Sequence, residues 1–183
     1  MDQGKNMSTI CLSMIVKDES HIIKDCLESV APLIDTWCIS DTGSTDGTQD
    51  LIREFFEERG IPGELHEDKW ENFSHNRTLA LDHSKGKSDY ILMIDADDFI
   101  AGDFRWPKNM DKDGYELKLQ RGNLEWWRIQ VFKNDGSWKY IGVLHEHPGL
   151  KDGSVPNMQK IFGDYHIEAR TMGARNLHQT PIE

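Results

Sequence analysis

The segment DYILMIDADD, residues 89–98, places an apolar run directly before three acidic residues, Asp95, Asp97 and Asp98. Two carboxylates about 5 Å apart repel each other by roughly 3 kcal/mol at an effective dielectric constant near 20. Such a cluster therefore needs full solvation, a proton or a cation. Carboxylate oxygens are the ligands that Mg²⁺ and Mn²⁺ prefer. We expect a divalent ion at this cluster, carried in together with a diphosphate.

Charged residues also follow two other apolar segments. The segment 10–16 runs into Lys17, Asp18 and Glu19, and the segment 36–40 runs into Asp41. Ligands of open α/β sheets bind outside the carboxyl ends of the parallel strands. If both segments are strands parallel to 90–94, their charged residues meet the acidic cluster at one edge of the sheet.

The order of apolar patterns predicts an α/β fold. Short apolar runs alternate with helical patterns such as Ile23, Cys26, Leu27 and Val30. This β-α-β-α-β-α-β order is typical of a mostly parallel, Rossmann-like sheet with helices on both faces. The expected strands are residues 10–16, 36–40, 63–67 and 90–94, and the expected helices cover 23–30, 51–56 and 74–83.

The second half of the chain has a different pattern of apolar and polar residues. We expect a polar loop at 99–114 and antiparallel hairpins after it. The expected strands of these hairpins are residues 115–120, 125–133 and 138–147, with another strand near 164–169. Trp126 and Trp127 would face opposite sides of their strand, one in the core and the other free for packing or for stacking on a sugar. We predict one domain over 1–183, with halves 10–98 and 99–170 and a tail at 171–183.

Composition excludes several classes of protein. The net charge of −11 over 183 residues argues against a general nucleic-acid binder, which needs a basic face. No apolar run approaches the length of a membrane span, and the first residues lack the apolar core of a signal peptide. Cys11, Cys26 and Cys38 each lie in apolar segments and are expected to be buried, reduced thiols. We therefore expect a cytoplasmic protein.

Five segments together resemble a known family. ICLSMIVKDE, ISDTGSTDGT, NFSHNRTLAL and LMIDADD occur in the order seen in family 2 glycosyltransferases of the GT-A fold, and YIGVLHEHP is similar to one subgroup of these enzymes. The resemblance runs from residue 10 to about residue 147. It implies a hexosyltransferase type of enzyme that moves a sugar from a nucleotide sugar, commonly a UDP-sugar, to an acceptor, with inversion at the anomeric carbon.

The resemblance also implies roles for individual residues. Val16 and Glu19 would line the nucleoside pocket, Asp41 would contact the uracil, Arg77 would approach the phosphates, Asp95 would lie near the ribose, and Lys17 and Ala96 would complete the nucleotide site. Asp97 would bind Mn²⁺ or Mg²⁺, with His166 as a third metal ligand. Glu146 falls where an acceptor-side catalytic acid is expected.

Independently of the resemblance, transfer of a sugar to an acceptor hydroxyl requires a base, because a hydroxyl is a poor nucleophile. An inverting displacement needs that base on the face opposite the leaving group. Glu146 or His145 could serve, and we favour Glu146. The acceptor, which could be a glycan, a peptide or a lipid-linked group, is left open, as is a homo-oligomer.

Two other functions remain to be weighed. A GT-A module could hold a nucleotide or glycan without turnover, in which case Glu146→Gln would change nothing measurable. A nucleotidyltransferase would make a nucleotide sugar instead of using one. Such enzymes usually carry a glycine- and basic-rich loop after the first strand, where this chain has VKDESHI.

Overall fold

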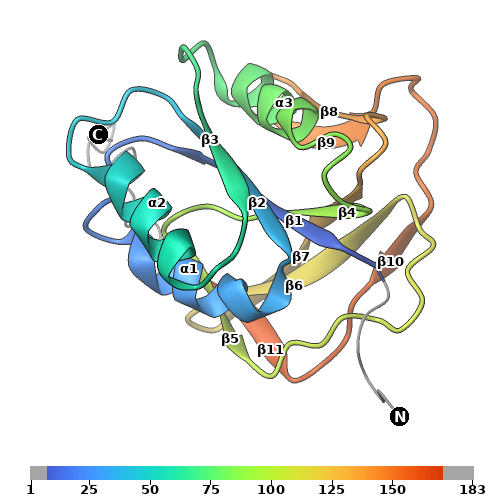
Figure 1. The fold of residues 1–183 in the computed structure, drawn as a ribbon. Coiled ribbons are helices and arrows are strands. Elements are labelled where there is room, and N and C mark those ends of the chain that lie inside the picture. Colours follow the sequence, from blue (N-terminus) through green and yellow to red (C-terminus); the bar gives the residue numbers. More distant parts are fainter. Residues whose placement is uncertain (1–7, 171–183) are drawn as a thin grey trace, which may run out of the picture.

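A mixed α/β sheet forms the centre of the computed structural model, which describes residues 8–170 (Figure 1). The elements follow one another as β1 (Ile10–Val16), α1 (Ile23–Val30), η1 (Ala31–Leu33), β2 (Thr36–Asp41), α2 (Thr48–Glu58), β3 (Gly63–Glu67), α3 (Phe73–His83), β4 (Tyr90–Met93), β5 (Asp98–Gly102), β6 (Gly114–Arg121), β7 (Leu124–Lys133), β8 (Trp138–Ile141), β9 (His147–Leu150), β10 (Met158–Lys160) and β11 (Tyr165–Ala169). The strand order in the main sheet is β3-β2-β1-β4-β7-β6-β11-β5, with β10 paired to β6.

The first half of the sheet is parallel, as the alternating pattern predicted. Strands β3, β2, β1 and β4 pair in parallel and in that order. The chain builds outward from β1 to β3 and then returns to the other side of β1 to form β4. This reversal creates a switch point at the carboxyl ends of β1 and β4, where α/β folds bind ligands.

Helices cover both faces of this parallel half, which confirms the predicted layers. Ile10, Leu12, Met14 and Val16 of β1 lie in one buried cluster with the apolar residues of α1 and α2. Ile15 belongs to a second cluster with residues of α3 and β4. Because side chains alternate along a strand, β1 is apolar on both faces, and its continuous run ICLSMIV follows from that position.

The second half is mainly antiparallel. Strands β6 and β7 form the predicted hairpin, and β7 joins β4 to connect the two halves. Trp126 packs against the first buried cluster, while the ring of Trp127 meets that of Phe162 with centroids 5.3 Å apart. One tryptophan is therefore packed against the core, as expected.

Two predictions about this half are wrong. The segment 99–114 is not wholly a loop, because β5 pairs antiparallel with the distant β11. The segment 138–147 is not one strand beside β7. It breaks at Gly142, whose φ of 97° is open mainly to glycine, and β8 pairs with β9 in a separate two-stranded sheet. Loop 142–146 therefore stands between β8 and β9.

The structure also bears on the predictions about the cysteines, the tail and membrane spans. Cys11, Cys26 and Cys38 are buried free thiols, as predicted. The tail predicted at 171–183 lies outside the described residues. None of the three α-helices within residues 8–170 has the length and apolar character needed to cross a bilayer.

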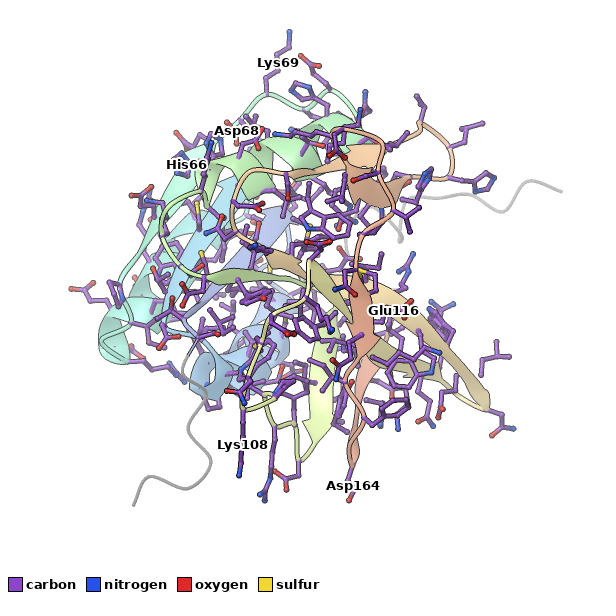
Figure 2. All side chains as sticks on the ribbon, turned by 90° about the vertical axis from the view of Figure 1, so that its right-hand side faces the viewer. His66, Asp68, Lys69, Lys108, Glu116 and Asp164 are labelled. Atoms are coloured by element: carbon purple, nitrogen blue, oxygen red, sulfur yellow. The ribbon has the colours of Figure 1, made fainter. Side chains whose placement is uncertain are left out.

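Figure 2 shows His66 and Asp68 at one end of the molecule and Lys108 and Asp164 at the opposite end.

Candidate active site

The segments that follow β1 and β2 are tied to each other by hydrogen bonds. The bonds run from Asp18 N to Ser44 Oγ (2.9 Å), Glu19 N to Thr48 Oγ1 (3.0 Å), Ser20 Oγ to Asp46 Oδ2 (2.6 Å) and Thr45 N to Asp18 Oδ1 (2.8 Å). Thr42 N and its hydroxyl also donate to the carbonyl of Val16. The motifs VKDES and DTGSTDGT therefore form one interlocked wall at the carboxyl ends of these strands.

Asp41 shapes the turn inside this wall. Its Oδ1 accepts hydrogen bonds from the backbone N–H groups of Gly43 and Ser44, at 2.9 and 2.8 Å, and from Gln49 Nε2 at 3.0 Å. The turn requires Gly43, because its φ of 113° is poorly accessible to other residues. Within residues 8–170, the buried Oδ2 of Asp41 has no hydrogen-bond partner. A buried acceptor of this kind is costly unless a ligand supplies a donor.

The motif NFSHNR positions Arg77. Asn72 caps α3 by accepting a hydrogen bond from His75 N at 2.8 Å. The buried Asn76 accepts from Glu71 N and donates to the carbonyl of Lys69, which fixes the chain entering the helix. Arg77 is the next residue, and it projects from α3 toward the carboxyl end of β4.

Arg77 is a cation whose side chain is 13% exposed and is held by an acid. Its Nη1 lies 3.0 Å from Asp95 Oδ1, and its guanidinium carbon lies 5.7 Å from the ring centroid of Tyr140. Burial is the largest single influence and would lower the pKa of Arg77, but Asp95, together with Tyr140 and Glu146, raises the pKa, so the group stays charged. The buried Nε has no acceptor among the described residues. The guanidinium can therefore still donate to an anion.

The acidic residues after β4 meet as the sequence predicted. One carboxylate oxygen from each of Asp95, Asp97 and Asp98 lies within 4.8 Å of the others. Asp97 and Asp98 are buried, and Arg170 Nε holds the carbonyl of Asp97 at 2.7 Å. Burial and then the neighbouring Asp95 and Asp97 raise the pKa of Asp98 to about 8. This oxygen-only, electrostatically strained set fits Mg²⁺ or Mn²⁺.

A cavity of about 70 Å³ lies beside this cluster. Its lining residues are Arg77, Asp95, Arg128, Ile129, Gln130, Tyr140, Glu146 and Pro148. The half-buried Glu146 comes from loop 142–146, and the exposed His145 is not among the lining residues. The structure therefore brings Glu146, but not His145, into one cavity with Arg77 and Asp95.

The remaining predicted nucleotide-site residues lie around the same edge. Val16 and Glu19 are buried on either side of the exposed Lys17, and Ala96 is buried between the acids that follow β4. All four occupy the carboxyl ends of β1 and β4, where the sequence placed them. Their contacts with a nucleotide remain predictions.

The structure does not bring His166 to the acidic cluster. His166 pairs with Ala101, three positions along from the Ala169–Asp98 pair. Directly opposed residues share a face, so alternation turns His166 to the other face from Asp98. Its Nε2 instead contacts Glu168 Oε2 at 2.8 Å. His166 therefore has no structural support as a metal ligand.

Arg128 and Tyr140 are two of the cavity residues that sequence reasoning missed. Arg128 lies on β7, in the same strand as the tryptophans, and it lines the cavity together with its neighbours Ile129 and Gln130. Tyr140 reaches Arg77 and donates from its hydroxyl to Met93 Sδ at 3.4 Å. No local signal marks Tyr140, because its place depends on how β8 packs against α3.

The raised pKa of Asp98 gives a prediction about stability. The pKa is about 8 in the folded protein against an ordinary 3.8, so folding retains a proton that the unfolded chain releases. In EDTA, the free energy of unfolding should fall as pH rises from about 4 to 8, by up to about 1.4 kcal/mol per pH unit. Urea unfolding at pH 5, 7 and 9 measures this slope. Asp98→Asn should flatten it, and an equal slope in the variant would contradict the assignment.

Comparisons with known proteins agree with this architecture. Residues 11–116 match the family described as Glycosyl transferase family 2. A TPR repeat-containing protein of Synechococcus elongatus is 36% identical over 91% of the chain, and the prophage-derived glycosyltransferase SunS of Bacillus subtilis is 29% identical over 81%. These alignments cover 41% and 36% of the two relatives, so the chain spans about two-fifths of their length.

Among solved structures, S. aureus TarS in complex with UDP is similar, with a TM-score of 0.49 and 16% identity. That match covers 63% of this chain and 36% of the TarS chain. The family match alone covers more than half of the chain, and the parallel β3-β2-β1-β4 half with its antiparallel extension is the GT-A arrangement expected from the motifs. The chain therefore belongs to glycosyl transferase family 2.

Proposed function

We propose that this domain is a metal-dependent, inverting glycosyltransferase that moves a sugar from a UDP-sugar to an acceptor hydroxyl. One observation carries the proposal: Arg77, Asp95 and Glu146 line a single cavity next to the acidic cluster. That cavity combines a cation for a leaving diphosphate with a carboxylate able to accept a proton. The relative SunS, which is itself named a glycosyltransferase, supports the same class of reaction.

The nucleoside would bind against the interlocked wall that follows β1 and β2. The unpartnered Oδ2 of Asp41 is a buried acceptor, and the N3–H of uracil is a donor of the matching kind. Val16, Lys17, Glu19 and Ala96 would surround the nucleoside at the same strand ends. Because Asp41 is already fixed by hydrogen bonds to Oδ1, little ordering is needed when a base binds.

The diphosphate would lie between Arg77 and the acidic cluster. Asp97 would hold Mn²⁺ or Mg²⁺, with Asp95 and Asp98 beside it. When bound, such an ion neutralises the charge that develops on the leaving diphosphate. Arg77, with its free Nε–H, would donate to the same phosphates and would keep its charge through its contact with Asp95.

Glu146 would act as the base that takes the proton of the acceptor hydroxyl. It enters the cavity from loop 142–146, a different side from the strand ends that carry the acids. This placement suits an inverting displacement, in which the acceptor attacks opposite the leaving group. His145, on the exposed side of the loop, stays the alternative base. The acceptor class, whether glycan, peptide or lipid-linked, is set by surfaces beyond the cavity.

Thermal unfolding with nucleotides tests the proposal. A ligand that binds only the folded state stabilises it by mass action, by about 2.7 kcal/mol at a concentration of 100 Kd, and so raises the melting temperature. UDP with Mn²⁺ or Mg²⁺ should raise it, and EDTA should cancel the shift. A shift with one UDP-sugar would identify the donor. No shift with any nucleotide, in a folded sample, would contradict the proposal.

Asp41→Asn tests the base contact. Asparagine can preserve the turn through its carbonyl oxygen but places an N–H₂ group where Oδ2 stands, opposite the N–H of the base. UDP affinity should fall by about 10- to 100-fold. Calorimetry measures the loss, and Asp35→Asn, at a carboxylate bonded to Ile10 N outside the site, is the control. Unchanged UDP affinity in Asp41→Asn would remove Asp41 from the nucleoside site.

A further inference from the structure

A second group of potential metal ligands lies on the other edge of the sheet, between β2 and β3. Cys38 and Glu64 are direct partners in the parallel β2–β3 register, and Ser40 is the partner of His66. Side chains two residues apart on a strand share a face, so Cys38, Glu64 and His66 all project to the same side. One ligand atom from each lies within 4.8 Å of the others.

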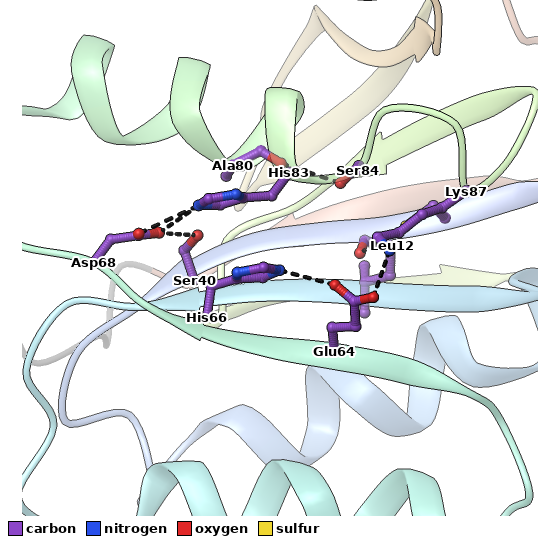
Figure 3. A network of polar contacts seen from close by, with 10 residues as sticks. Leu12, Ser40, Glu64, His66, Asp68, Ala80, His83, Ser84 and Lys87 are labelled. Carbon is purple, nitrogen blue, oxygen red and sulfur yellow. Dashed lines mark hydrogen bonds and ion pairs between the residues drawn. The ribbon is translucent and has the colours of Figure 1, made fainter.

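The surrounding contacts orient Glu64 and His66 (Figure 3). His66 Nε2 lies 3.0 Å from Glu64 Oε2, and Lys87 Nζ lies 2.6 Å from Glu64 Oε1. The ring of His83 stacks on that of His66, with centroids 4.0 Å apart and planes 4° from parallel. Asp68 holds His83 Nε2 at 3.0 Å. The imidazole of His66 is thus fixed from the side as well as at its tip.

We propose that Cys38, Glu64 and His66 form a site for a thiophilic divalent cation such as Zn²⁺. Sulfur, nitrogen and oxygen ligands within one small sphere suit zinc, which binds them at about 2.0–2.3 Å with tetrahedral geometry. The ion would replace the proton between His66 and Glu64, and the thiol proton of Cys38 would pass to solvent. Water would take the fourth position.

Charge and ligand type both support a cation here. Glu64 and Asp68 bring two carboxylates to a cluster in which Lys87 is the cation that contacts Glu64. The ligand types also differ from those of the acidic cluster after β4, which is made only of oxygens. Carboxylate sites favour Mg²⁺ or Mn²⁺, whereas thiolate and imidazole favour Zn²⁺. The two clusters should therefore select different metals.

Ser13 provides an independent observation. It is the direct partner of Cys38 in the β1–β2 register and is fully buried, and its hydroxyl has no hydrogen-bond partner within residues 8–170. A neutral thiol is a weak acceptor, but a metal-bound thiolate is a strong one. The two side chains are not hydrogen-bonded in this structure, so zinc binding would have to draw the Cys38 thiolate toward the Ser13 hydroxyl. Hydrogen bonds of this type orient the ligands of known metal sites.

The consequence for the fold is a cross-link at an edge strand. Strand β3 ends the sheet, and Cys38 and Glu64 lie on neighbouring strands, so an ion would join β3 to β2. The stacked His83 ends α3, the helix that carries Arg77. Zinc binding would therefore stabilise the edge of the sheet and the end of this helix.

Titration of the metal-free protein with Co²⁺ tests the site, because cobalt–thiolate bonds absorb in the near ultraviolet. The expected result is a charge-transfer band that Zn²⁺ displaces. Cys38→Ser should abolish the band, and His66→Gln should weaken Co²⁺ binding if the serine variant fails to fold. Lys87→Met should tighten binding about tenfold, because it removes a competing positive charge. If the cluster were only a network of hydrogen bonds that binds no metal, Lys87→Met would not tighten Co²⁺ binding.

Matched variants separate this site from the acidic cluster. Cys26 Sγ lies 3.5 Å from the carbonyl of Asp95, so Cys26 is the thiol beside that cluster. Cys26→Ser and Asp97→Asn should both keep the cobalt band. No band in the wild-type protein would overturn the proposal. A band that survives Cys38→Ser but disappears in Cys26→Ser would overturn it too, by moving the ion to the other cluster.

Discussion

Glu146→Gln should lower turnover by about 10²- to 10⁴-fold and leave UDP binding unchanged. The variant keeps the size and polarity of the side chain but cannot take a proton from the acceptor hydroxyl, and positioned bases contribute about this factor. Glu146 lines the cavity with Arg77 and Asp95, where the proposed reaction needs its base. Single-turnover transfer and calorimetry with UDP measure the two quantities separately.

The neighbouring histidine supplies the control for this experiment. His145 is exposed and absent from the cavity lining, so His145→Gln should keep most of the activity. If His145→Gln is the inactive variant, the base is His145. If Glu146→Gln transfers sugar at the wild-type rate, Glu146 has no catalytic role. Should the wild-type domain bind UDP without any turnover, the non-catalytic binding module becomes the better description.

Asp97→Asn should remove the dependence of UDP binding on divalent metal. A metal ion that bridges to phosphates supplies several kcal/mol, so UDP affinity in Mn²⁺ should fall by about 10²- to 10³-fold. In EDTA, the variant and the wild-type protein should bind UDP equally weakly. The variant also loses one of the charges that raise the pKa of Asp98.

Asp103→Asn is a matched control for Asp97→Asn. Asp103 follows β5 in the same region of the chain, but its carboxylate pairs with Arg105 at 2.9 Å on the surface. Its replacement should leave metal-dependent binding intact. Calorimetry with UDP in Mn²⁺ and in EDTA measures all three proteins. Wild-type affinity in Asp97→Asn would show that the acidic cluster does not hold the ion.

The parallel half of the fold was predictable because its patterns are local. The run ICLSMIV is apolar at every position, which indicates a strand buried on both faces, and β1 coincides with residues 10–16. The antiparallel half was harder because its pairing depends on distant partners. Strand β5 is defined by β11, whose first residue lies more than sixty positions later in the chain, and the segment DFIAG carries little sign of that pairing.

Some residues of the candidate site could likewise be predicted from local patterns, and others could not. Asp41 and the acids after β4 could be placed together because parallel strands end at one edge of the sheet. Glu146 was identified from a motif and not from a pattern, and the loop that holds it follows an unpredicted break at Gly142. His166 was predicted as a metal ligand from the same resemblance, within a segment expected to be a strand. Only the strand register shows that it faces away from Asp98.

The interlocked segments after β1 and β2 have a consequence for how this domain could diversify. Each supplies donors and acceptors to the other, as in the bonds between Asp18, Ser44 and Thr45, so neither can change alone without cost. Loop 142–146 is joined to a different part of the fold, where Ser74 Oγ donates to the carbonyl of Gly142. If the proposed transferase function holds, a grafted loop could redirect it to new acceptors, while the interlocked segments are inherited unaltered.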